Sequence, residues 1–348
     1  MPRECRTKKE DSILIQHNKP VIIILVLLLI IVIPISVSIG SSDIFPVLTA
    51  KILLSQFIPI EQIWAESQEA IIMDVRLPRV LLAGLVGAAL ATAGCALQGL
   101  LKNPMADPYI IGISSGAGLG AAISMFIFAL PVQLISFILA LMTIFTVYNI
   151  SRVAGKVPVD ILLLSGIAIG LFLNAITSWI IFKTESPHQL IAWLMGGFWV
   201  VLWSEVKITG VLVIVGVLML YRYAWSLNVM LMGEEQAQYM GVDIERVKLY
   251  VLILSSLITA AAVSVSGLIG FVGLIIPHIM RIIVGPDHRI LFPASTLMGA
   301  IFLIFADTLT RTDSILCLLG LPVGIVTAMF GAPFFIYLLR KRRKTLYA

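Results

Sequence analysis

Residues 112–116 have the spacing of a nucleophilic serine site. They read GISSG, which formally matches the G-x-S-x-G elbow of serine hydrolases. That elbow needs a preceding strand, and it needs histidine and acidic partners that activate the serine. The flanks here are apolar and helical in pattern, and the four histidines of the chain lie at termini, loops or expected helix ends. We therefore interpret these hydroxyls as packing positions, and a hydrolase that uses Ser114 stays an alternative.

Polar side chains between residues 278 and 289 form a second group with ligand-like chemistry. They are His278, Arg281, Asp287, His288 and Arg289. A metal site would need more convergent ligands than this group offers, so we interpret it as a basic helix end at the membrane surface. The three cysteines are far apart and form no CxxC motif, so neither a disulfide framework nor a zinc site follows. We expect the chain itself to bind no metal and no cofactor.

Asp307 is the one acidic residue beside an otherwise apolar run, which makes it a candidate for ion-coupled transport. We expect it at the outer edge of its helix, where a carboxylate can reach water. The chain has no G-x-x-x-x-G-K-[ST] loop that could cradle ATP phosphates. If ATP drives this protein, a partner subunit must therefore hydrolyse it. A secondary transporter that uses Asp307 is the alternative.

The composition places these residues in a membrane protein. The 348 residues are 59% hydrophobic and only 12% charged, with a mean hydropathy of +1.05. Soluble proteins are nearer to half apolar and a quarter charged. The net charge of +5 is concentrated at the flanks of apolar runs, which does not favour nucleic acid as a partner.

Ten apolar runs are long enough to cross a bilayer as helices of about 17 to 25 residues. They cover residues 21–40, 80–101, 110–130, 132–150, 160–182, 206–221, 249–267, 268–286, 290–306 and 315–339. The sequence thus predicts an all-α, polytopic protein with one ten-helix domain, residues 21–340, between a tail at 1–20 and a basic tail at 341–348. The first run could instead be a cleaved signal peptide. The tryptophan-rich segment 190–203 is too short to span and predicts an interfacial or re-entrant helix.

The distribution of Lys and Arg predicts the orientation. With the N-terminus inside, the inner segments hold 18 of these residues and the outer segments hold six. The positive-inside rule then places both termini in the cytoplasm. The outer segment 41–78 is long and mixed, which predicts irregular structure or a surface helix. Glycines and alanines three or four residues apart, as at Gly87, Ala91 and Gly94, predict closely packed helices.

A polar stretch at 232–248 interrupts two apolar runs on the predicted cytoplasmic side. Residues 234–240 suit a helix of about two turns, with an acidic pair in its first turn. Gly233 and Gly241 can supply its flexible start and its left-handed stop. We interpret this short helix as a docking element for a cytoplasmic partner; a solvated linker is the alternative.

Five stretches together resemble one known family. They read RLPRVLLAGLVGAALATAGCALQGLLKNPMADPYIIGISSGAG (76–118), GEEQAQYMGV (233–242), SGLIGFVGLIIPHIMR (266–281), DHR (287–289) and LPVGIVTAMFGAPFF (321–335). In order and spacing they resemble the permeases of binding-protein-dependent ABC importers for vitamin B12, ferric siderophores and haem. The departures from the family pattern are mild. Lys102 stands where Arg or Glu is frequent, and Met105 stands where Leu is frequent.

The resemblance implies ten helices per subunit, a second permease copy or close paralogue, two cytoplasmic ATPase subunits and an external substrate-binding protein. Arg76, Arg79 and Arg311 match outward arginines that meet acidic residues on the two lobes of the binding protein. We expect these arginines to be exposed, each contributing about 0.2 to 1 kcal/mol. Their role is then orientation and steering rather than tight adhesion.

The resemblance also assigns the polar stretch to ATPase coupling, through Gly233, Glu234, Glu235, Ala237 and Gly241. A cytoplasmic gate is implied on two inner loops.

The gate residues implied are Asn103, Met105, Lys156 and Pro158. The expected protein is thus a multi-pass permease of the cell membrane that imports a metal chelate at the expense of ATP hydrolysed by a partner. The sequence does not distinguish a ferric siderophore, haem and cobalamin as the substrate.

Overall fold

The secondary structure of the described residues consists of helices joined by turns and irregular segments. The computed structural model describes residues 3–346 except 41, 43, 57, 154, 186 and 312–319, and side chains of residues 19–337 and 340 outside these gaps. Within this part, the one extended pairing is an isolated bridge between Val153 and Lys156. Most side chains of the predicted tails at 1–20 and 341–348 lie outside the described residues.

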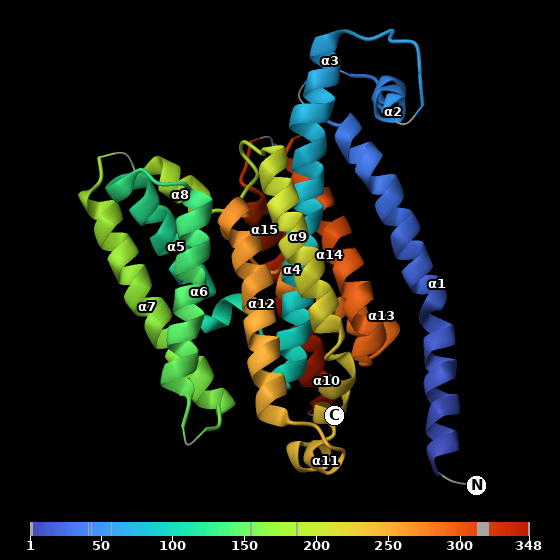
Figure 1. The fold of residues 1–348 in the computed structure, drawn as a ribbon, viewed down its shortest axis with the longest axis vertical. Coiled ribbons are helices and arrows are strands. Elements are labelled where there is room, and N and C mark those ends of the chain that lie inside the picture. Colours follow the sequence, from blue (N-terminus) through green and yellow to red (C-terminus); the bar gives the residue numbers. More distant parts are fainter. Residues whose placement is uncertain are drawn as a thin grey trace.

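Fifteen α-helices follow one another along the described chain (Figure 1). They are α1 (Arg3–Ser38), α2 (Pro46–Ser55), α3 (Glu66–Ala70), α4 (Leu77–Leu100), α5 (Ile113–Ile123), α6 (Val132–Ser151), α7 (Val159–Lys183), α8 (His188–Leu194), α9 (Trp203–Tyr221), α10 (Ala224–Leu231), α11 (Glu234–Tyr239), α12 (Ile244–Ser266), α13 (Val272–Val284), α14 (His288–Thr310) and α15 (Val323–Leu346).

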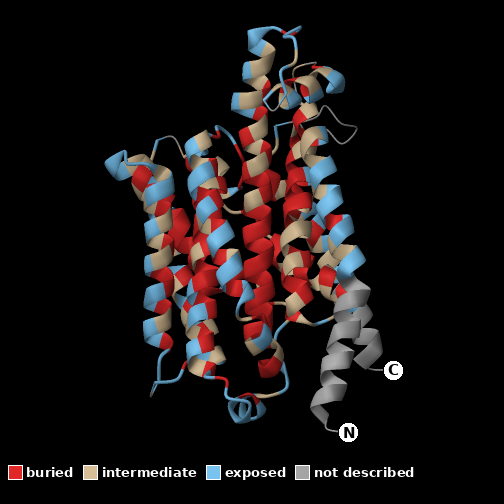
Figure 2. Ribbon diagram, turned by 45° about the vertical axis from the view of Figure 1, so that its right-hand side comes forward, coloured by how far each residue is buried: buried red, intermediate tan, exposed pale blue. Residues whose placement is uncertain are grey.

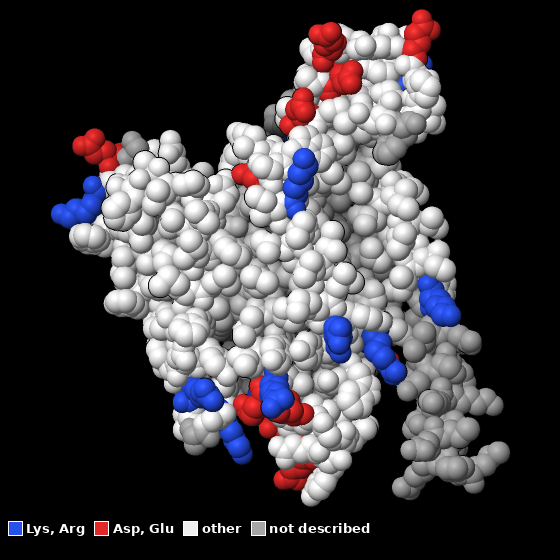
Figure 3. Space-filling view, viewed as in Figure 1, with Lys and Arg blue, Asp and Glu red and all other residues white. Residues whose placement is uncertain are grey.

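Seven helices of the described part are long and apolar enough to cross a membrane. They are Lys19–Ser38 within α1, the continuous helix Glu66–Leu100, and α6, α7, α9, α12 and α14. The other three predicted runs coincide with shorter apolar helices, namely α5 with a π-helical turn, α13 and α15. Charged side chains gather toward the two ends of the molecule and leave a broad uncharged band between them (Figure 3). The fold is therefore that of an all-helical, multi-pass membrane protein.

The helix predicted over 190–203 is wrong in its extent. Helix α8 ends at Leu194, and Trp203 already belongs to α9. The break occurs at Gly196, whose φ of 70° is left-handed and therefore favours glycine. The next amide, of Gly197, donates to the Ser266 carbonyl 2.7 Å away. The segment is thus anchored to the end of α12 instead of continuing as a helix.

The segment 41–78 forms a projection at the end of the molecule opposite α11, with two surface helices, α2 and α3 (Figure 1). A π-helical turn at Ile71–Arg76 joins α3 to α4, so that one continuous helix, Glu66–Leu100, rises above the rest of the bundle (Figure 1). The segment also contains irregular chain around residues 58–65. The expectation of mixed surface structure is confirmed.

Helix α4 is the centre of the bundle, buried on nearly all sides by α14, α12, α13 and α9 (Figure 2). Glycines allow the closest of these approaches. A Cβ atom at Gly87 would lie 2.2 Å from the Gly299 carbonyl oxygen, and one at Gly94 would lie 1.8 Å from the Gly273 oxygen. Backbones meet directly at these crossings, which confirms the predicted packing of small residues.

Helices α5, α6 and α7 form a second unit that joins the central bundle chiefly through contacts of α6 with α12 (Figure 1). Glycines again set the spacing, because a Cβ at Gly120 would lie 2.6 Å from the Ser136 Cα on α6. Gly112, with φ of 85°, begins α5 after a short 3₁₀ turn. A hydrolase elbow requires a strand at that place, so the geometry does not support the serine-nucleophile alternative.

The glycine crossing at the centre generates a stability prediction. We expect Gly94→Ala to lower the free energy of unfolding by about 3 kcal/mol or more, because the new methyl group overlaps the backbone of α13 and overpacking costs 1 to 3 kcal/mol even where side chains can yield. Gly210→Ala is the matched control, since its Cβ would meet only Leu85 Cδ1 at 3.5 Å. Thermal unfolding of the purified variants measures both, and equal melting temperatures would contradict the prediction.

Candidate functional site

A buried carboxylate near the end of the bundle that carries α2 and α3 holds two of the predicted arginines. Asp307 on α14 is fully buried and accepts from Arg79 on α4, with Arg79 Nη2 to Oδ1 at 2.8 Å and Nε to Oδ1 at 3.0 Å. Arg311, one turn after Asp307, forms an ion pair with its Oδ2 at 3.0 Å. The expectation that Asp307 reaches water is wrong, because the two guanidinium groups and the helix packing enclose it.

Arg311 also caps the C-terminal end of α1. Its Nη1 donates to the carbonyls of Ser36 and Ile39, at 3.3 and 3.0 Å, and its Nη2 donates to the Ser36 hydroxyl at 2.8 Å. The last carbonyls of a helix have no partner within the helix, and a cation there is favourable. Burial lowers the pKa of Arg311, whereas the nearby Asp307 raises it.

Arg76 has the same capping role, and the prediction that it is exposed is wrong. Its guanidinium donates to the carbonyls of Val37 at 3.2 Å, Ser38 at 3.1 Å and Ser42 at 2.6 Å, and the residue is only 5% exposed. The last carbonyls of a helix have no partner within the helix, and those of α1 hold this side chain in the interior. Arg76 therefore fixes the outer end of α1 to the start of α4.

The three arginines line one cavity of about 490 Å³ at this end of the bundle, together with Trp199 and Leu321. Arg79 is the most open of the three, with 24% of its side chain exposed, against 10% for Arg311. Two of the three guanidinium groups pair with the one carboxylate of Asp307, and Arg76 is held by backbone carbonyls, so the cavity is positively charged and suits an acidic group. The sequence indicated the arginines but missed the carboxylate that Arg79 and Arg311 share, although the four-residue spacing of Asp307 and Arg311 on one helix is a usable signal.

At the opposite end, the predicted docking helix forms α11 (Figure 1). It has six residues, slightly fewer than predicted, and lies between Gly233 with φ of 128° and Gly241 with φ of 82°. Ala237 is fully buried against the protein itself, whereas Tyr239 is 91% exposed. The surface that α11 offers to a partner is therefore that of Tyr239 and its exposed neighbours, and the Ala237 side chain is not part of it.

A polar link runs from α11 to the loop between α6 and α7. Lys248 on α12 forms ion pairs with Glu234 at 3.1 Å and with Glu245 at 3.2 Å. The other oxygen of Glu245 accepts from the Val157 amide at 3.1 Å. Lys248 is nearly buried, with 9% of its side chain exposed, whereas its partners Glu234 and Glu245 remain 49% and 34% exposed. The sequence showed no sign of this connection.

The four residues assigned to a gate lie in two separate turns. In the first, Asn103 Oδ1 accepts from the Met105 amide at 3.0 Å. In the second, Lys156 pairs with Val153, and Pro158 precedes α7. No hydrogen bond or ion pair joins the two turns within the described residues.

Asp107 follows the first turn. Its carboxylate accepts from the Tyr109 amide at 2.8 Å. Burial raises the pKa of Asp107 to about 6, although this hydrogen bond opposes the rise.

The polar residues between 278 and 289 tie helix ends together. Arg281 Nη1 donates to Gln98 Oε1 at 3.0 Å, and the Asn228 amide donates to Asp287 Oδ1 at 2.6 Å. Asp287 also caps α14 through the Arg289 amide at 2.9 Å. Burial would raise the pKa of Asp287, but its hydrogen bonds with Arg289 and Asn228 outweigh burial and lower it. These contacts are structural in character.

The buried carboxylate generates a second prediction. We expect Asp307→Asn to destabilise the protein by about 3 to 5 kcal/mol, since removing one partner of a buried ion pair leaves Arg311 without its counter-charge. Asp243→Asn is the matched control: Asp243 and Arg246 are exposed and 2.9 Å apart, and Asn also caps a helix well. Its effect should stay below about 1 kcal/mol. Comparable losses in thermal unfolding for the two variants would refute the structural role of Asp307.

Comparison with known proteins relates this geometry to one family. The model of the FecCD transport family matches residues 24–341. The chain is 46% identical over 281 residues to a cobalamin import system permease, BtuC, of Halobacterium salinarum, which covers 80% of this chain and 75% of that protein. It is 38% identical over 282 residues to the hemin transport permease HmuU of Yersinia pestis, covering 78% of this chain and 84% of that one.

A solved structure agrees with these matches. It is an inward-facing conformation of a metal-chelate type ABC transporter, with a TM-score of 0.80 and 31% identity, and the match covers 92% of this chain and 99% of that chain. The chain belongs to the FecCD transport family and is a multi-pass membrane permease subunit of an ABC importer.

Proposed function

We propose that this permease receives a metal chelate from an external binding protein and passes it inward through a pathway shared with a second permease copy or close paralogue. Two cytoplasmic ATPase subunits drive it. The observation that carries the proposal is the placement of two unlike surfaces at opposite ends of one bundle, a basic cavity and an exposed coupling helix. The names of the relatives make cobalamin, haem and ferric chelates the candidate substrates.

We propose ten membrane helices with both termini in the cytoplasm. Seven long apolar helices and three shorter ones match the ten predicted runs. The first residue of α1 and the last residue of α15 lie toward the end that carries α11 (Figure 1). The excess of Lys and Arg in the predicted inner segments supports the cytoplasm as the location of that end.

In this proposal Arg79 is the arginine that meets an acidic residue of the binding protein. Its guanidinium is the most open of the three, and the pair with Asp307 holds it in place at the cavity. Arg76 and Arg311 contribute positive charge to the cavity while they cap α1. A partly exposed guanidinium of this kind acts mainly by steering and orientation.

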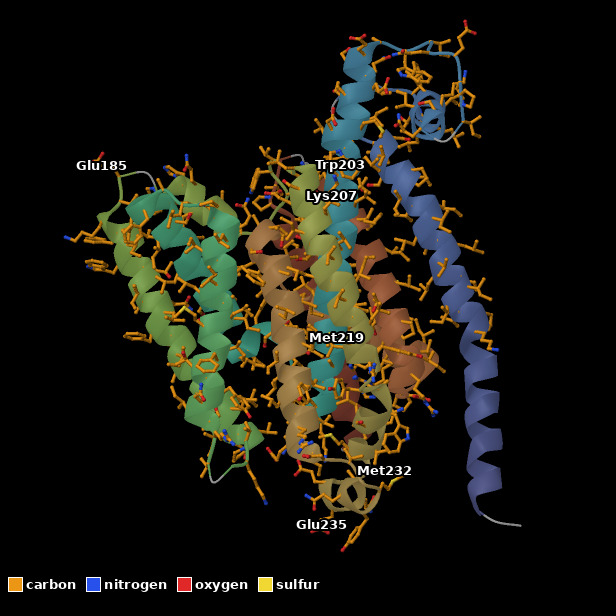
Figure 4. The ribbon with its side chains drawn as sticks, in the orientation of Figure 1. Glu185, Trp203, Lys207, Met219, Met232 and Glu235 are labelled. Carbon is orange, nitrogen blue, oxygen red and sulfur yellow. The ribbon has the colours of Figure 1, made fainter. Side chains whose placement is uncertain are left out.

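Helix α11 is proposed to dock into an ATPase subunit through its exposed face, which includes Glu235 (Figure 4) and Tyr239. When the ATPase dimer closes on ATP, a force on α11 reaches Lys248 through Glu234 and reaches the α6–α7 loop through Glu245. The proposed cytoplasmic gate, with Asn103, Met105, Lys156 and Pro158, lies on this loop and on the loop after α4. The polar link thus offers a direct route from the ATPase to part of that gate.

The geometry disfavours an ion-coupled carrier. Such a carrier needs a carboxylate that exchanges ions or protons with water. Asp307 is fully buried and paired with Arg79 and Arg311, so it is neither accessible nor free of counter-charge.

The docking proposal predicts a defect in delivery for Arg79→Ala. We expect the concentration of loaded binding protein that half-stimulates ATP hydrolysis to rise about fivefold, the effect of losing a charge pair of about 1 kcal/mol. Lys183→Ala is the control, since Lys183 is an exposed cation at the end of α7, outside the cavity. ATP hydrolysis by the reconstituted importer, titrated with loaded binding protein, measures this concentration, and transport at limiting binding protein is measured beside it. Wild-type transport by Arg79→Ala would exclude its docking role.

The coupling proposal predicts that Tyr239→Ala weakens ATPase assembly and reduces ATP-driven transport at least tenfold. An exposed aromatic side chain that anchors an interface commonly contributes 2 kcal/mol or more. Phe45→Ala is the control, because Phe45 is 80% exposed but precedes α2 at the outer end. Co-purification of the ATPase subunits and uptake into proteoliposomes are the measurements.

In the same assay, Lys248→Met separates docking from transmission. This variant should still co-purify with the ATPase subunits, because the exposed face of α11 is unchanged. It should lose transport, because the ion pairs of Lys248 with Glu234 and Glu245 are removed. Full transport by both Tyr239→Ala and Lys248→Met would exclude coupling through α11.

A further inference from the structure

An apolar groove of about 550 Å³ runs along the face of the bundle between α1, α4, α9 and α14. Its walls are aliphatic side chains and small residues, with Thr296 and Lys207 as its polar members. It is lined by Leu29, Ile33, Val80, Leu81, Gly84, Leu85, Ala88, Val206, Lys207, Gly210, Val211, Ile214, Thr296, Leu297, Ala300 and Ile304. All four helices contain candidate membrane spans, so the groove lies at the depth of lipid chains.

Small residues give the groove its depth. Gly84 and Ala88 of α4, Gly210 of α9 and Ala300 of α14 line it where larger side chains would fill the space. A Cβ atom added to Gly210 would have its nearest neighbour, Leu85 Cδ1, 3.5 Å away, so the groove is open beside Gly210. The exposed Val211 and Ile214 form its rim on the lipid side.

Lys207 lies at the outer end of the groove and is exposed (Figure 4). It is one helical turn from Trp203, whose indole Nε1 donates to the Met73 carbonyl at 3.0 Å. Tryptophan at a helix end marks the membrane interface, where the phosphates of lipids lie close by. Lys207 forms no ion pair with any residue that the structure describes.

The length of the groove fits one leaflet. Residues 207 to 214 of α9 span roughly 10 Å at 1.5 Å per residue. Half of a bilayer's hydrocarbon core is about 15 Å thick. A chain whose headgroup sits at Lys207 would therefore lie in the groove over most of one leaflet.

From these observations we propose that the groove binds one acyl chain of an anionic phospholipid, with its phosphate at Lys207. An unpaired cation above an apolar groove matches a ligand that has an anionic head and a hydrocarbon tail. A helix from a second copy of the chain fits less well, because it would bury Lys207 in an apolar contact at a large desolvation cost. The bound lipid would brace α1 against the bundle at a place where these helices do not fill the space themselves.

Native mass spectrometry of the detergent-purified permease, titrated with dioleoylphosphatidylglycerol and with dioleoylphosphatidylcholine, tests the proposal. We expect one phosphatidylglycerol to bind each chain more tightly than later ones. Lys207→Gln should weaken that binding roughly fivefold, the contribution of one lysine near a membrane surface, and should leave phosphatidylcholine unaffected. Val211→Trp fills the groove and should weaken binding of both lipids at least fivefold.

Leu218→Trp is the matched control. Leu218 is 63% exposed and Val211 64%, both on α9, but Leu218 lies seven residues farther along and lines no part of the groove. Both tryptophan variants should keep the wild-type melting temperature. Unchanged phosphatidylglycerol binding by Lys207→Gln, or equal lipid binding by the two tryptophan variants, would overturn the proposal. A change in oligomeric mass for Val211→Trp in place of a change in lipid binding would also overturn it, since the groove would then be a protein interface.

Discussion

The ion pairs of Asp307 with Arg79 and Arg311 hold the outer end of the molecule together. One carboxylate joins α4 to α14, and Arg311 extends the connection to the end of α1. These helices are 228 residues apart in sequence at the Arg79–Asp307 contact. Buried ion pairs add little to stability compared with apolar packing of the same volume, but breaking one is costly. Their benefit here is geometric, because they fix three helix ends and keep a guanidinium at the mouth of the cavity.

The helix positions, including that of the short helix α11, could be predicted from sequence, because apolar runs and glycine-bounded polar stretches are local signals. The side-chain environments could not. Arg76 matches a motif and was expected to be exposed, yet its contacts with the carbonyls of α1 bury it. Ala237 lies in the right helix but faces the protein. The link from Lys248 to Glu234 and Glu245 depends on how α11 and α12 are oriented across the turn between them. A local sequence pattern does not predict that orientation.

The arginine cavity also shows how family motifs and physical roles can differ. Three arginines that a motif treats alike have three environments, since Arg76 caps α1, Arg311 joins α1 to α14, and only Arg79 keeps a substantial exposed surface. Clustering raises the local positive potential for all of them. An acidic residue of a partner would therefore be attracted by the positive potential of the whole cluster, but it could contact Arg79 most directly.

The packing indicates which part of the molecule can move. Where α4 meets α13 and α14, backbones touch at glycines such as Gly94 and Gly87, and close-packed contacts of this kind leave no room for sliding. The unit of α5, α6 and α7 joins this core chiefly through α12, and the Val157 amide ties its loop to Glu245. In the proposed mechanism, a displacement of α11 is passed through Lys248 toward this unit. In the proposed mechanism, the central helices form the frame, and α5 to α7 tilt against it to open or close the inner end of the pathway.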